Sequence, residues 1–377
     1  MSLPTELVWA ILHQIEDIQS LQSCSLASSH LRIPAQQALF TDFKIPTLRA
    51  AACDDFLRDA PHIVGYITSL RIELRVIDLS LEDTKTYGKQ LTHILSRFGS
   101  VRQCYLDGSF DVPTLLVDNP FILSQLERLC PQELHIHRLR NIPSSLFQRL
   151  ARIAPRLSFS TALLADHRAS EKEYDVEQLN LWTLTDPICR FFANARLPQL
   201  VRLRLDVNAD INVDAFKLVE NCAETLQSLT FMYSPASGTH IPPRPLPILP
   251  TLLHVTFFLR FQDRGSSWFQ ETATAILSPS TAPSLRHATI AYIPTYTPFS
   301  CPPYIARDHL LPLLDAVLSR HPVRPRLRWV LNLITAHCQW EHANETAFNV
   351  FADGLKMGMP VMQRERRLEF EKVSSRK

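Results

Sequence analysis

The chain begins with a short segment whose apolar residues recur at helical spacing. Leu7, Ile11 and Ile15 are each separated by four residues, the spacing of one helix face. The run from Leu7 to Leu12 is apolar throughout, so Val8 and Leu12 make a second apolar stripe beside the first. The pattern predicts a helix with more apolar surface than one inward face can use.

A second helix and a third are expected directly afterwards. Asp17 is a plausible N-cap for the second helix, which carries three apolar residues, Ile18, Leu21 and Leu26. Pro34 is expected to break the following helix at Ile33, leaving a short helix that ends at Phe40. A helical segment of about 45 residues rarely builds an adequate core alone. We therefore expect a protein partner to cover its surplus apolar surface.

The apolar run does not have the features of a targeting or membrane segment. No positive charge precedes it, Glu6 lies beside it, and no small-residue cleavage site follows. A bilayer span needs about 20 apolar residues, and this run has six. We expect a protein that is neither secreted nor held in a membrane.

The rest of the chain alternates strand-like and helix-like patterns. The template Leu-x-x-Leu-x-Leu, which marks the strand of a leucine-rich repeat, has nine loose matches. The spacing between starts is 26 residues twice in succession, from Leu200 to Leu226 and from Leu226 to Leu252, which is a typical repeat length. The longer gaps indicate insertions or a degenerate copy. The matches start at Ile67, Val101, Pro131, Ala154, Leu200, Leu226, Leu252, Leu285 and Leu327.

Helical stripes lie between several of these strands. The clearest runs through Leu91, Ile94, Leu95 and Phe98, and similar stripes occupy residues 216–222 and 310–318. Such units must stack on their neighbours to bury their apolar faces. The predicted fold is an α/β solenoid of irregular leucine-rich-repeat-like strand–helix units after the N-terminal helices, with parallel strands on the concave side and helices outside. An ordinary α/β domain is the alternative, since strand–helix alternation suits both.

Two proline-rich loops and a charged end interrupt this pattern. Residues 234–250 contain a Pro-x-x-Pro pattern, which is compatible with a polyproline helix that docks on an aromatic groove. A stiff loop between repeats is the expected role of this segment. Residues 292–304 mix proline with aromatic residues, and Tyr296 and Phe299 are candidate recognition anchors there. The segment 363–377 is highly charged and is expected to be a solvated tail.

Composition narrows the function classes further. The chain has 377 residues, of which 46% are hydrophobic and 20% charged, as in folded proteins. Its net charge of +2 predicts no strong attraction to nucleic acid or to anionic membranes. Only 8 glycines accompany 27 prolines, and no phosphate-binding loop, dinucleotide fingerprint or nucleophile elbow occurs in the sequence.

Candidate metal ligands and nucleophiles are sparse. His135 and His137 would share one strand face, but no second ligand pair stands at matching spacing, so a structural role is expected. The eight cysteines are scattered singly, which is typical of reduced thiols in the cytosol or nucleus. The sequence predicts no enzyme, no metal site and no cofactor.

The N-terminal segment resembles an F-box, the adaptor-binding motif of Skp–cullin–F-box ubiquitin ligases. The resemblance is carried by the family's Leu-Pro-x-Glu-Leu start and its later apolar positions. The continuation "RIPAQQALF" is similar to fungal members, and Leu31 stands where the family commonly has Trp. The matching residues are Leu3, Pro4, Glu6, Leu7, Ile11, Ile15, Leu21, Ser25 and Leu26.

This resemblance implies a division into an F-box at 1–45, a substrate-recognition domain at 46–362 and the tail at 363–377. It implies that the F-box binds a Skp-type adaptor, and through it a cullin, while the repeats bind an unknown protein target. A scaffold that acts without ubiquitination is the alternative. The expected adaptor-binding residues are Leu3, Pro4, Glu6, Leu7, Ile11, Leu12, Ile15, Leu21, Leu26 and Leu31. The candidate target-binding residues are Arg71, Tyr105, His135, Arg204, Tyr296 and Phe299.

Overall fold

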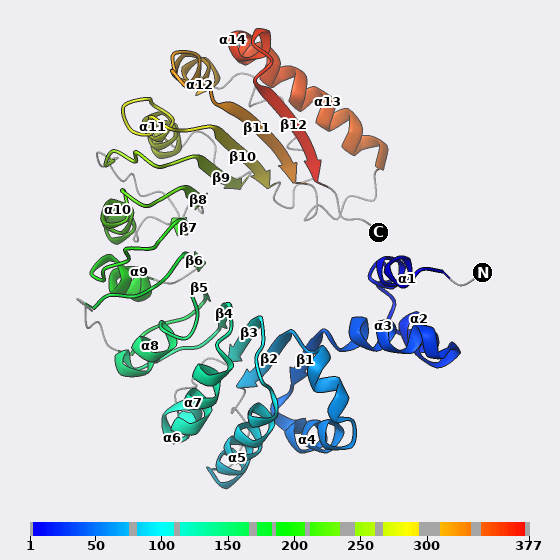
Figure 1. Ribbon diagram of the computed structural model, residues 1–377. Coiled ribbons are helices and arrows are strands. Elements are labelled where there is room, and N and C mark those ends of the chain that lie inside the picture. Colours follow the sequence, from blue (N-terminus) through cyan, green and yellow to red (C-terminus); the bar gives the residue numbers. More distant parts are fainter. Residues whose placement is uncertain are drawn as a thin grey trace. The chain divides into compact units, whose positions relative to one another are not determined.

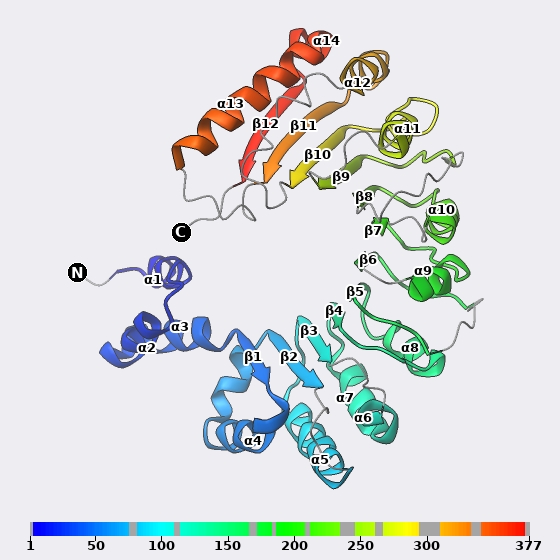
Figure 2. The same cartoon turned by 180° about the vertical axis from the view of Figure 1, so that it is seen from behind.

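The computed structural model describes residues 3–74, 81–108, 114–165, 172–182, 186–207, 212–233, 246–260, 267–293, 310–332 and 341–373. The chain divides into two compact units, Met1–Arg168 and Ala169–Lys377. Each unit consists of parallel strands that alternate with helices, which confirms the predicted α/β class. Within each unit the helices flank one side of the strands, and we call the opposite side the helix-free face (Figures 1 and 2).

The first unit begins with three helices and continues as strand–helix repeats. Its elements are α1 (Thr5–Leu12), α2 (Ile18–Ala27), α3 (Ser29–Phe40), β1 (Asp42–Ile45), η1 (Thr47–Arg49), α4 (Ala50–Asp59), η2 (Pro61–Tyr66), β2 (Ser69–Leu74), α5 (Leu81–Arg97), β3 (Gln103–Gly108), α6 (Thr114–Asp118), α7 (Pro120–Leu129), β4 (Glu133–His137), α8 (Ser144–Leu150) and β5 (Arg156–Ser160).

The second unit continues the same alternation with longer strands. Its elements are β6 (Gln178–Trp182), α9 (Asp186–Ala193), β7 (Arg202–Val207), α10 (Asn212–Asn221), β8 (Ser228–Tyr233), β9 (His254–Arg260), α11 (Ser267–Ile276), β10 (His287–Ile293), α12 (Leu310–Ser319), β11 (Arg326–Asn332), α13 (Glu341–Gly358), α14 (Pro360–Arg364) and β12 (Leu368–Val373).

The strands pair in chain order within each unit, so equivalent residues form rows across the sheet. In the first unit one row begins at the partly buried Phe43 and continues through the buried residues Leu70, Cys104, Leu134 and Leu157. In the second unit the equivalent row runs through Leu179, Leu203, Leu229, Val255, Ala288 and Leu327. Because side chains alternate along a strand, these rows face the helices and the residues between them point to the helix-free face.

Backbone hydrogen bonds tie each repeat to the one before it. The amides of Gln227 and Ser228 both donate to the carbonyl of Val201, and those of Leu253 and His254 both donate to the carbonyl of Gln227. The Thr225 hydroxyl donates to the Leu200 carbonyl, a contact that Thr251 repeats one unit later. These bonds align successive strands.

All nine template matches fall on strands, but the ninth was aligned incorrectly. A match that starts at Leu327 places Val330 at the template's second leucine, the position that Ala288 holds in the preceding match. In the structure Leu327 pairs with Ala288, so the ninth unit is shifted by three residues from the predicted register. Strand β6 was missed, although Val176, Leu179 and Leu181 fit the template. All three of these side chains are buried.

The sheet extends beyond the predicted limits of the repeat domain at both ends. Strand β1 lies inside the segment 1–45 and pairs with β2, so the helical part of that segment ends at Phe40. Strand β12 lies inside the predicted tail 363–377 and pairs with β11. The expectation of a solvated tail is therefore wrong for Leu368–Val373, because the apolar residues Leu368 and Phe370 continue the rows of the sheet.

The N-terminal helices match the sequence prediction at Asp17 and differ at Pro34. The Asp17 carboxylate accepts hydrogen bonds from the amides of Gln19 and Ser20 and caps α2, as predicted. Pro34 does not break the chain into two helices but lies within a continuous α3. Pro34 and Ala35 are both buried, and their packing offsets the backbone hydrogen bond that a proline cannot donate.

Candidate functional site

A small core holds the three N-terminal helices together. Leu12 of α1, Leu21 of α2 and Ala35 of α3 are buried against one another. Several partly buried residues surround them: Val8, Ile15, Cys24, Leu31, Ala38 and Leu39. The helical segment therefore uses the stripe of Val8 and Leu12 for its own folding.

The other apolar stripe of this segment is left in solvent. Leu7 and Ile11 are 51% and 52% exposed, although they lie one helical turn apart on α1. Leu3 is 61% exposed and Leu26, on α2, is 83% exposed. Exposed apolar residues gathered on one small segment are typical of a surface that binds another protein.

The structure thus divides the predicted adaptor-binding residues into two sets. Leu12 and Leu21 are buried, and Ile15 and Leu31 are partly buried, so these four stabilise the segment itself. The remaining residues are exposed to solvent: Leu3, Pro4, Glu6, Leu7, Ile11 and Leu26. Sequence spacing alone could not separate the two sets, because both stripes are apolar.

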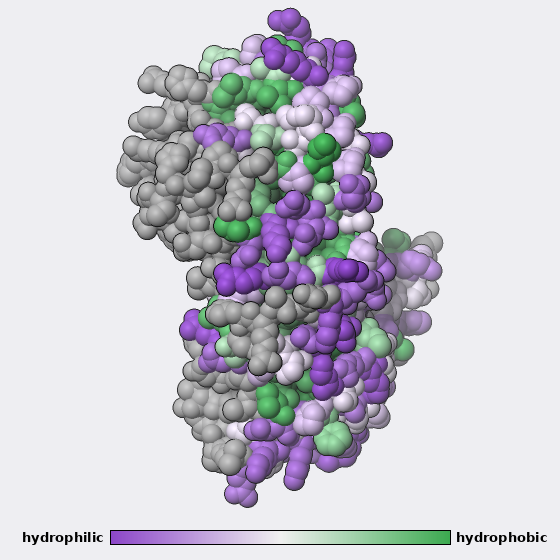
Figure 3. All heavy atoms as spheres, turned by 90° about the vertical axis from the view of Figure 1, so that its left-hand side faces the viewer, coloured by the Kyte–Doolittle hydropathy of each residue, from purple (hydrophilic) through white to green (hydrophobic). Residues whose placement is uncertain are grey.

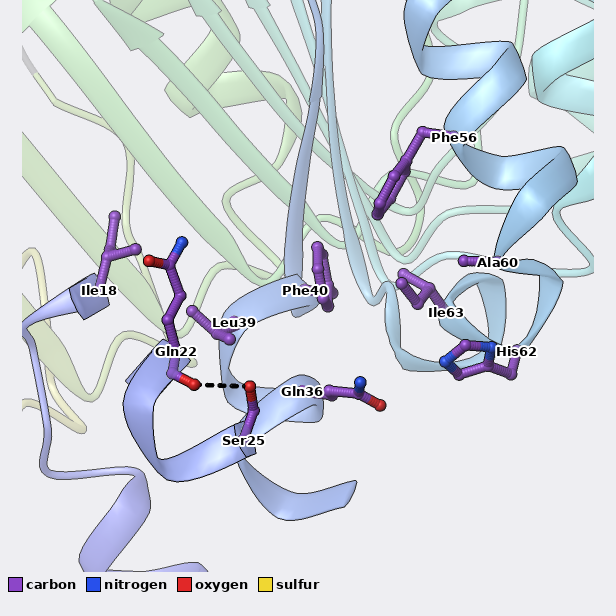
Figure 4. Close-up of a pocket in the computed structure, with 10 residues that line it drawn as sticks. All are labelled: Ile18, Gln22, Ser25, Gln36, Leu39, Phe40, Phe56, Ala60, His62 and Ile63. Atoms are coloured by element: carbon purple, nitrogen blue, oxygen red, sulfur yellow. Dashed lines mark hydrogen bonds between the residues drawn. The ribbon is translucent and has the colours of Figure 1, made fainter. Parts of the chain in front are cut away.

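A groove of about 430 Å³ lies between α2 and α3 on one side and α4 and η2 on the other (Figure 4). Ile18 and Leu39 line its first side, and Phe56 and Ile63 line its second. Ile18 is 62% exposed beside this groove. The sequence carried no signal for this groove, because its walls come from separate elements.

Aromatic rings connect the N-terminal helices to the first strand–helix unit. The Phe40 ring, at the end of α3, lies 5.6 Å from the Phe56 ring on α4. Phe43 of β1 stacks on Phe56 with centroids 6.3 Å apart, and it also contacts Phe98. This chain of rings anchors the exposed stripe to the body of the first unit.

The helix-free face of the first unit brings three of the predicted target-binding residues together. Arg71, Tyr105 and His135 occupy one row across β2, β3 and β4. The Arg71 guanidinium carbon lies 5.2 Å from the centre of the Tyr105 ring. Arg71 and Tyr105 also line a shallow groove of about 400 Å³ near β1.

Charges on the same face are paired within the protein. Arg156 bonds Glu133 at 3.1 Å, and Arg138 bonds Asp107 at 2.8 Å. Burial works to raise the pKa of the Glu133 carboxyl, but the hydrogen bonds from Arg156 and Gln103 outweigh it and lower that pKa. The face is therefore electrostatically balanced along β3 to β5.

The fourth predicted residue, Arg204, lies on the helix-free face of the second unit. Its guanidinium carbon is 3.5 Å from the centre of the Trp182 ring and 4.8 Å from that of Phe258. The sequence analysis missed both rings. An alternating-face analysis of β6 and β9 could have found them, because both lie on the helix-free face. Tyr296 and Phe299 lie outside the residues that the structure describes.

The described residues include histidines, cysteines and carboxylates, the usual protein ligands of metal ions. They contain no group of three or more His, Cys, Asp or Glu side chains that could hold a metal ion. Burial raises the pKa of the Cys104 and Cys222 thiols to about 12, which makes them poor nucleophiles at neutral pH. No helix in the described ranges is long and apolar enough to cross a bilayer.

On the face drawn in Figure 3, hydrophilic residues spread over the described surface and smaller hydrophobic patches lie between them.

A comparison with known proteins finds no family model that matches this chain and no similar curated protein. The exposed apolar stripe and the helix-free faces are therefore the features of the molecule that bear on its function.

Proposed function

We propose that this protein is the substrate-recognition subunit of a Skp–cullin–F-box ubiquitin ligase. In this proposal the helical segment α1–α3 binds a Skp-type adaptor, and through it a cullin, while the helix-free faces bind a protein target. The observation that carries it is the exposure of Leu3, Leu7, Ile11 and Leu26 on a small helical segment. Their spacing is what the resemblance to an F-box requires.

The subunit itself would form and break no bonds. It would hold a target close to the charged conjugating enzyme, which raises the effective concentration of the target lysine. The aromatic contacts from Phe40 to Phe56 suit this role, because they fix the adaptor-binding segment to the first repeat. A rigid connection transmits the position of the target to the ligase.

The decisive experiment co-expresses the full chain with a Skp-type adaptor and analyses the mixture by size-exclusion chromatography. The wild-type chain is expected to co-elute with the adaptor in a stoichiometric complex. Leu7→Asp combined with Ile11→Asp is expected to abolish co-elution, because two unpaired charges cannot be buried at an apolar interface. Both residues are half exposed in the free chain, so the variant should still fold.

A matched control places the same charges on another helix. Val350 and Met357 lie two turns apart on α13 and are 45% and 75% exposed. Val350→Asp with Met357→Asp should leave adaptor binding unchanged. A wild-type chain that runs alone, folded and without the adaptor, contradicts the proposal.

A scaffold without ligase activity is distinguished by adding a cullin to the purified complex. Formation of a ternary complex supports the ligase proposal. A stable pair of chain and adaptor that excludes the cullin favours a scaffold instead.

A further inference from the structure

On the helix-free face of strands β6 to β10, the described cations outnumber the described carboxylates. Arg202 and Arg204 lie on this face of β7, and Arg202 is exposed. Among the described residues of these five strands that point to this face, the only carboxylate is Asp206, which is 6% exposed. The charge balance differs from that of the first unit, where Arg156 and Arg138 are paired.

The pattern also differs from the end of the same sheet. On β11, Arg326 bonds Glu369 at 3.1 Å and Arg328 bonds Glu371, both across to β12. Those two cations are neutralised by neighbouring strands. Among the described side chains on the helix-free face of this sheet, the excess of positive charge therefore lies on β7.

Arg204 is held in a fixed orientation at the centre of this region. Its guanidinium lies between the rings of Trp182 on β6 and Phe258 on β9. The Nε–H of Arg204 is buried and has no hydrogen-bond acceptor in the described part of the chain. Burial lowers the pKa of Arg204 to about 10, with the Asp206 charge opposing the shift, so the group remains charged at neutral pH. A guanidinium preorganised by contacts with two aromatic rings is suited to binding a carboxylate.

The surroundings favour an extended peptide as the source of that carboxylate. Arg202 and Arg204 are two residues apart on one strand face, a separation of about 7 Å that matches alternate side chains of an extended chain. Polar side chains without charge continue the rows on either side: Asn180, Thr230, Thr256 and Thr289. The partly exposed rings of Trp182 and Phe258 can contact an apolar side chain next to the acidic one.

We propose that this face binds an acidic, extended segment of the target protein, with one carboxylate bound by the Arg204 guanidinium between Trp182 and Phe258. The inference rests on the proposed function only in taking the occupant to be a target of the ligase. Its chemistry depends on β6 to β10 and does not involve the adaptor-binding helices.

The test measures binding of the full chain to a fluorescein-labelled peptide, Gly-Glu-Glu-Phe-Glu-Glu-Gly, by fluorescence anisotropy. The same peptide with every Glu replaced by Gln is the matched ligand. The wild-type chain is expected to bind the acidic peptide about tenfold more tightly, and this difference should shrink with added salt. Equal binding of the two peptides would overturn the inference without any need for a variant.

Arg204→Gln should lose about tenfold in affinity for the acidic peptide, since it removes the charge-assisted hydrogen bonds. Arg204→Lys keeps the charge but not the planar stacking, so its affinity should lie between those of Arg204→Gln and the wild type. Arg326→Gln, which removes a cation already paired with Glu369, should bind the peptide as the wild type does. Wild-type affinity in both Arg204 variants would overturn the role of this residue.

A labelled single-stranded oligouridine provides the competing occupant. Tighter binding of this RNA than of the acidic peptide would overturn the assignment to a peptide.

The adaptor assay separates this inference from the proposed function. Arg204→Gln should co-elute with the adaptor as the wild type does, and the Leu7→Asp, Ile11→Asp variant should still bind the peptide.

Discussion

The imidazole ring of His135 stacks on the phenol ring of Tyr105, with ring centroids 4.3 Å apart and planes inclined by 8°. The two residues are register partners on β4 and β3, so the sheet spacing itself brings the rings into contact. Glu133 lies on the same strand face, with a carboxylate oxygen 3.6 Å from the His135 Nε2. Burial lowers the pKa of His135, and the Glu133 charge opposes this shift.

This relationship predicts how His135 titrates. Glu133→Gln removes the negative charge that favours the imidazolium, so the pKa of His135 should fall further below its ordinary value. An NMR titration of the histidine ring protons measures this directly. Glu127→Gln, which removes a partner of Arg149 on the helix side, should leave the His135 titration unchanged. An unchanged or higher pKa in Glu133→Gln would contradict the electrostatic relationship.

The buried histidine His321 should make stability depend on pH. Its Nε2 lies 3.0 Å from the Ala282 carbonyl oxygen, and its Nδ1 accepts from the Val323 amide, so the neutral ring fits the site. Burial lowers the pKa of His321 below 6.5. The hydrogen bond to Ala282 acts to raise this pKa, and the positive charge of Arg367 acts to lower it. At this site the unfolded chain therefore binds more protons than the folded chain. The stability gained by burying the neutral ring is complete above about pH 6.5 and is lost as the pH falls toward the folded-state pKa.

The measurement compares the wild type with His321→Gln by urea unfolding between about pH 7.5 and pH 5.5. The glutamine cannot titrate in this range. We expect the stability advantage of the wild type to shrink as the pH falls. An advantage that grows on acidification would show that the native site favours the charged ring.

Asp315 of α12 should stabilise the C-terminal end of the second unit, because its side chain caps α14, a helix far along the sequence. Its carboxylate accepts hydrogen bonds from the amides of Met362 at 2.8 Å and Val361 at 3.0 Å, in the first turn of α14. Asp315→Ala should lower the free energy of unfolding by about 1–3 kcal/mol, because two amides lose their acceptor. Asp353→Ala, which removes an exposed partner of Lys356, should cost at most about 0.5 kcal/mol. Equal losses in the two variants would contradict the capping role.

The two stripes of α1 should differ in their effect on local stability. Leu12 is 3% exposed, so Leu12→Ala should destabilise the helical segment by about 2–4 kcal/mol. Leu7→Ala should cost less than about 0.5 kcal/mol in the free chain, since Leu7 is already in solvent. Hydrogen exchange of the α1–α3 amides measures both effects. Similar protection losses in the two variants would mean that Leu7 also packs internally.

Much of the local structure could be predicted because it depends on short-range patterns. The spacing of Leu91, Ile94 and Leu95 specifies one face of α5, and all three side chains are buried. The alternation at Cys104 and Leu106 specifies β3 in the same way. The ninth repeat failed because "RLRWVLN" is apolar at consecutive positions, and such a run does not define which residues face the helices.

The sequence by itself determined the repeating strand–helix plan and the surplus of apolar residues at the start of the chain. Only the tertiary structure decided that Leu12 is buried while Leu7 is exposed, and that Arg204 lies between Trp182 and Phe258. The physical reason is that periodicity reports which residues share a face, whereas burial depends on what packs against that face. The packing elements, α3 for Leu12 and strands β6 and β9 for Arg204, come from other parts of the chain.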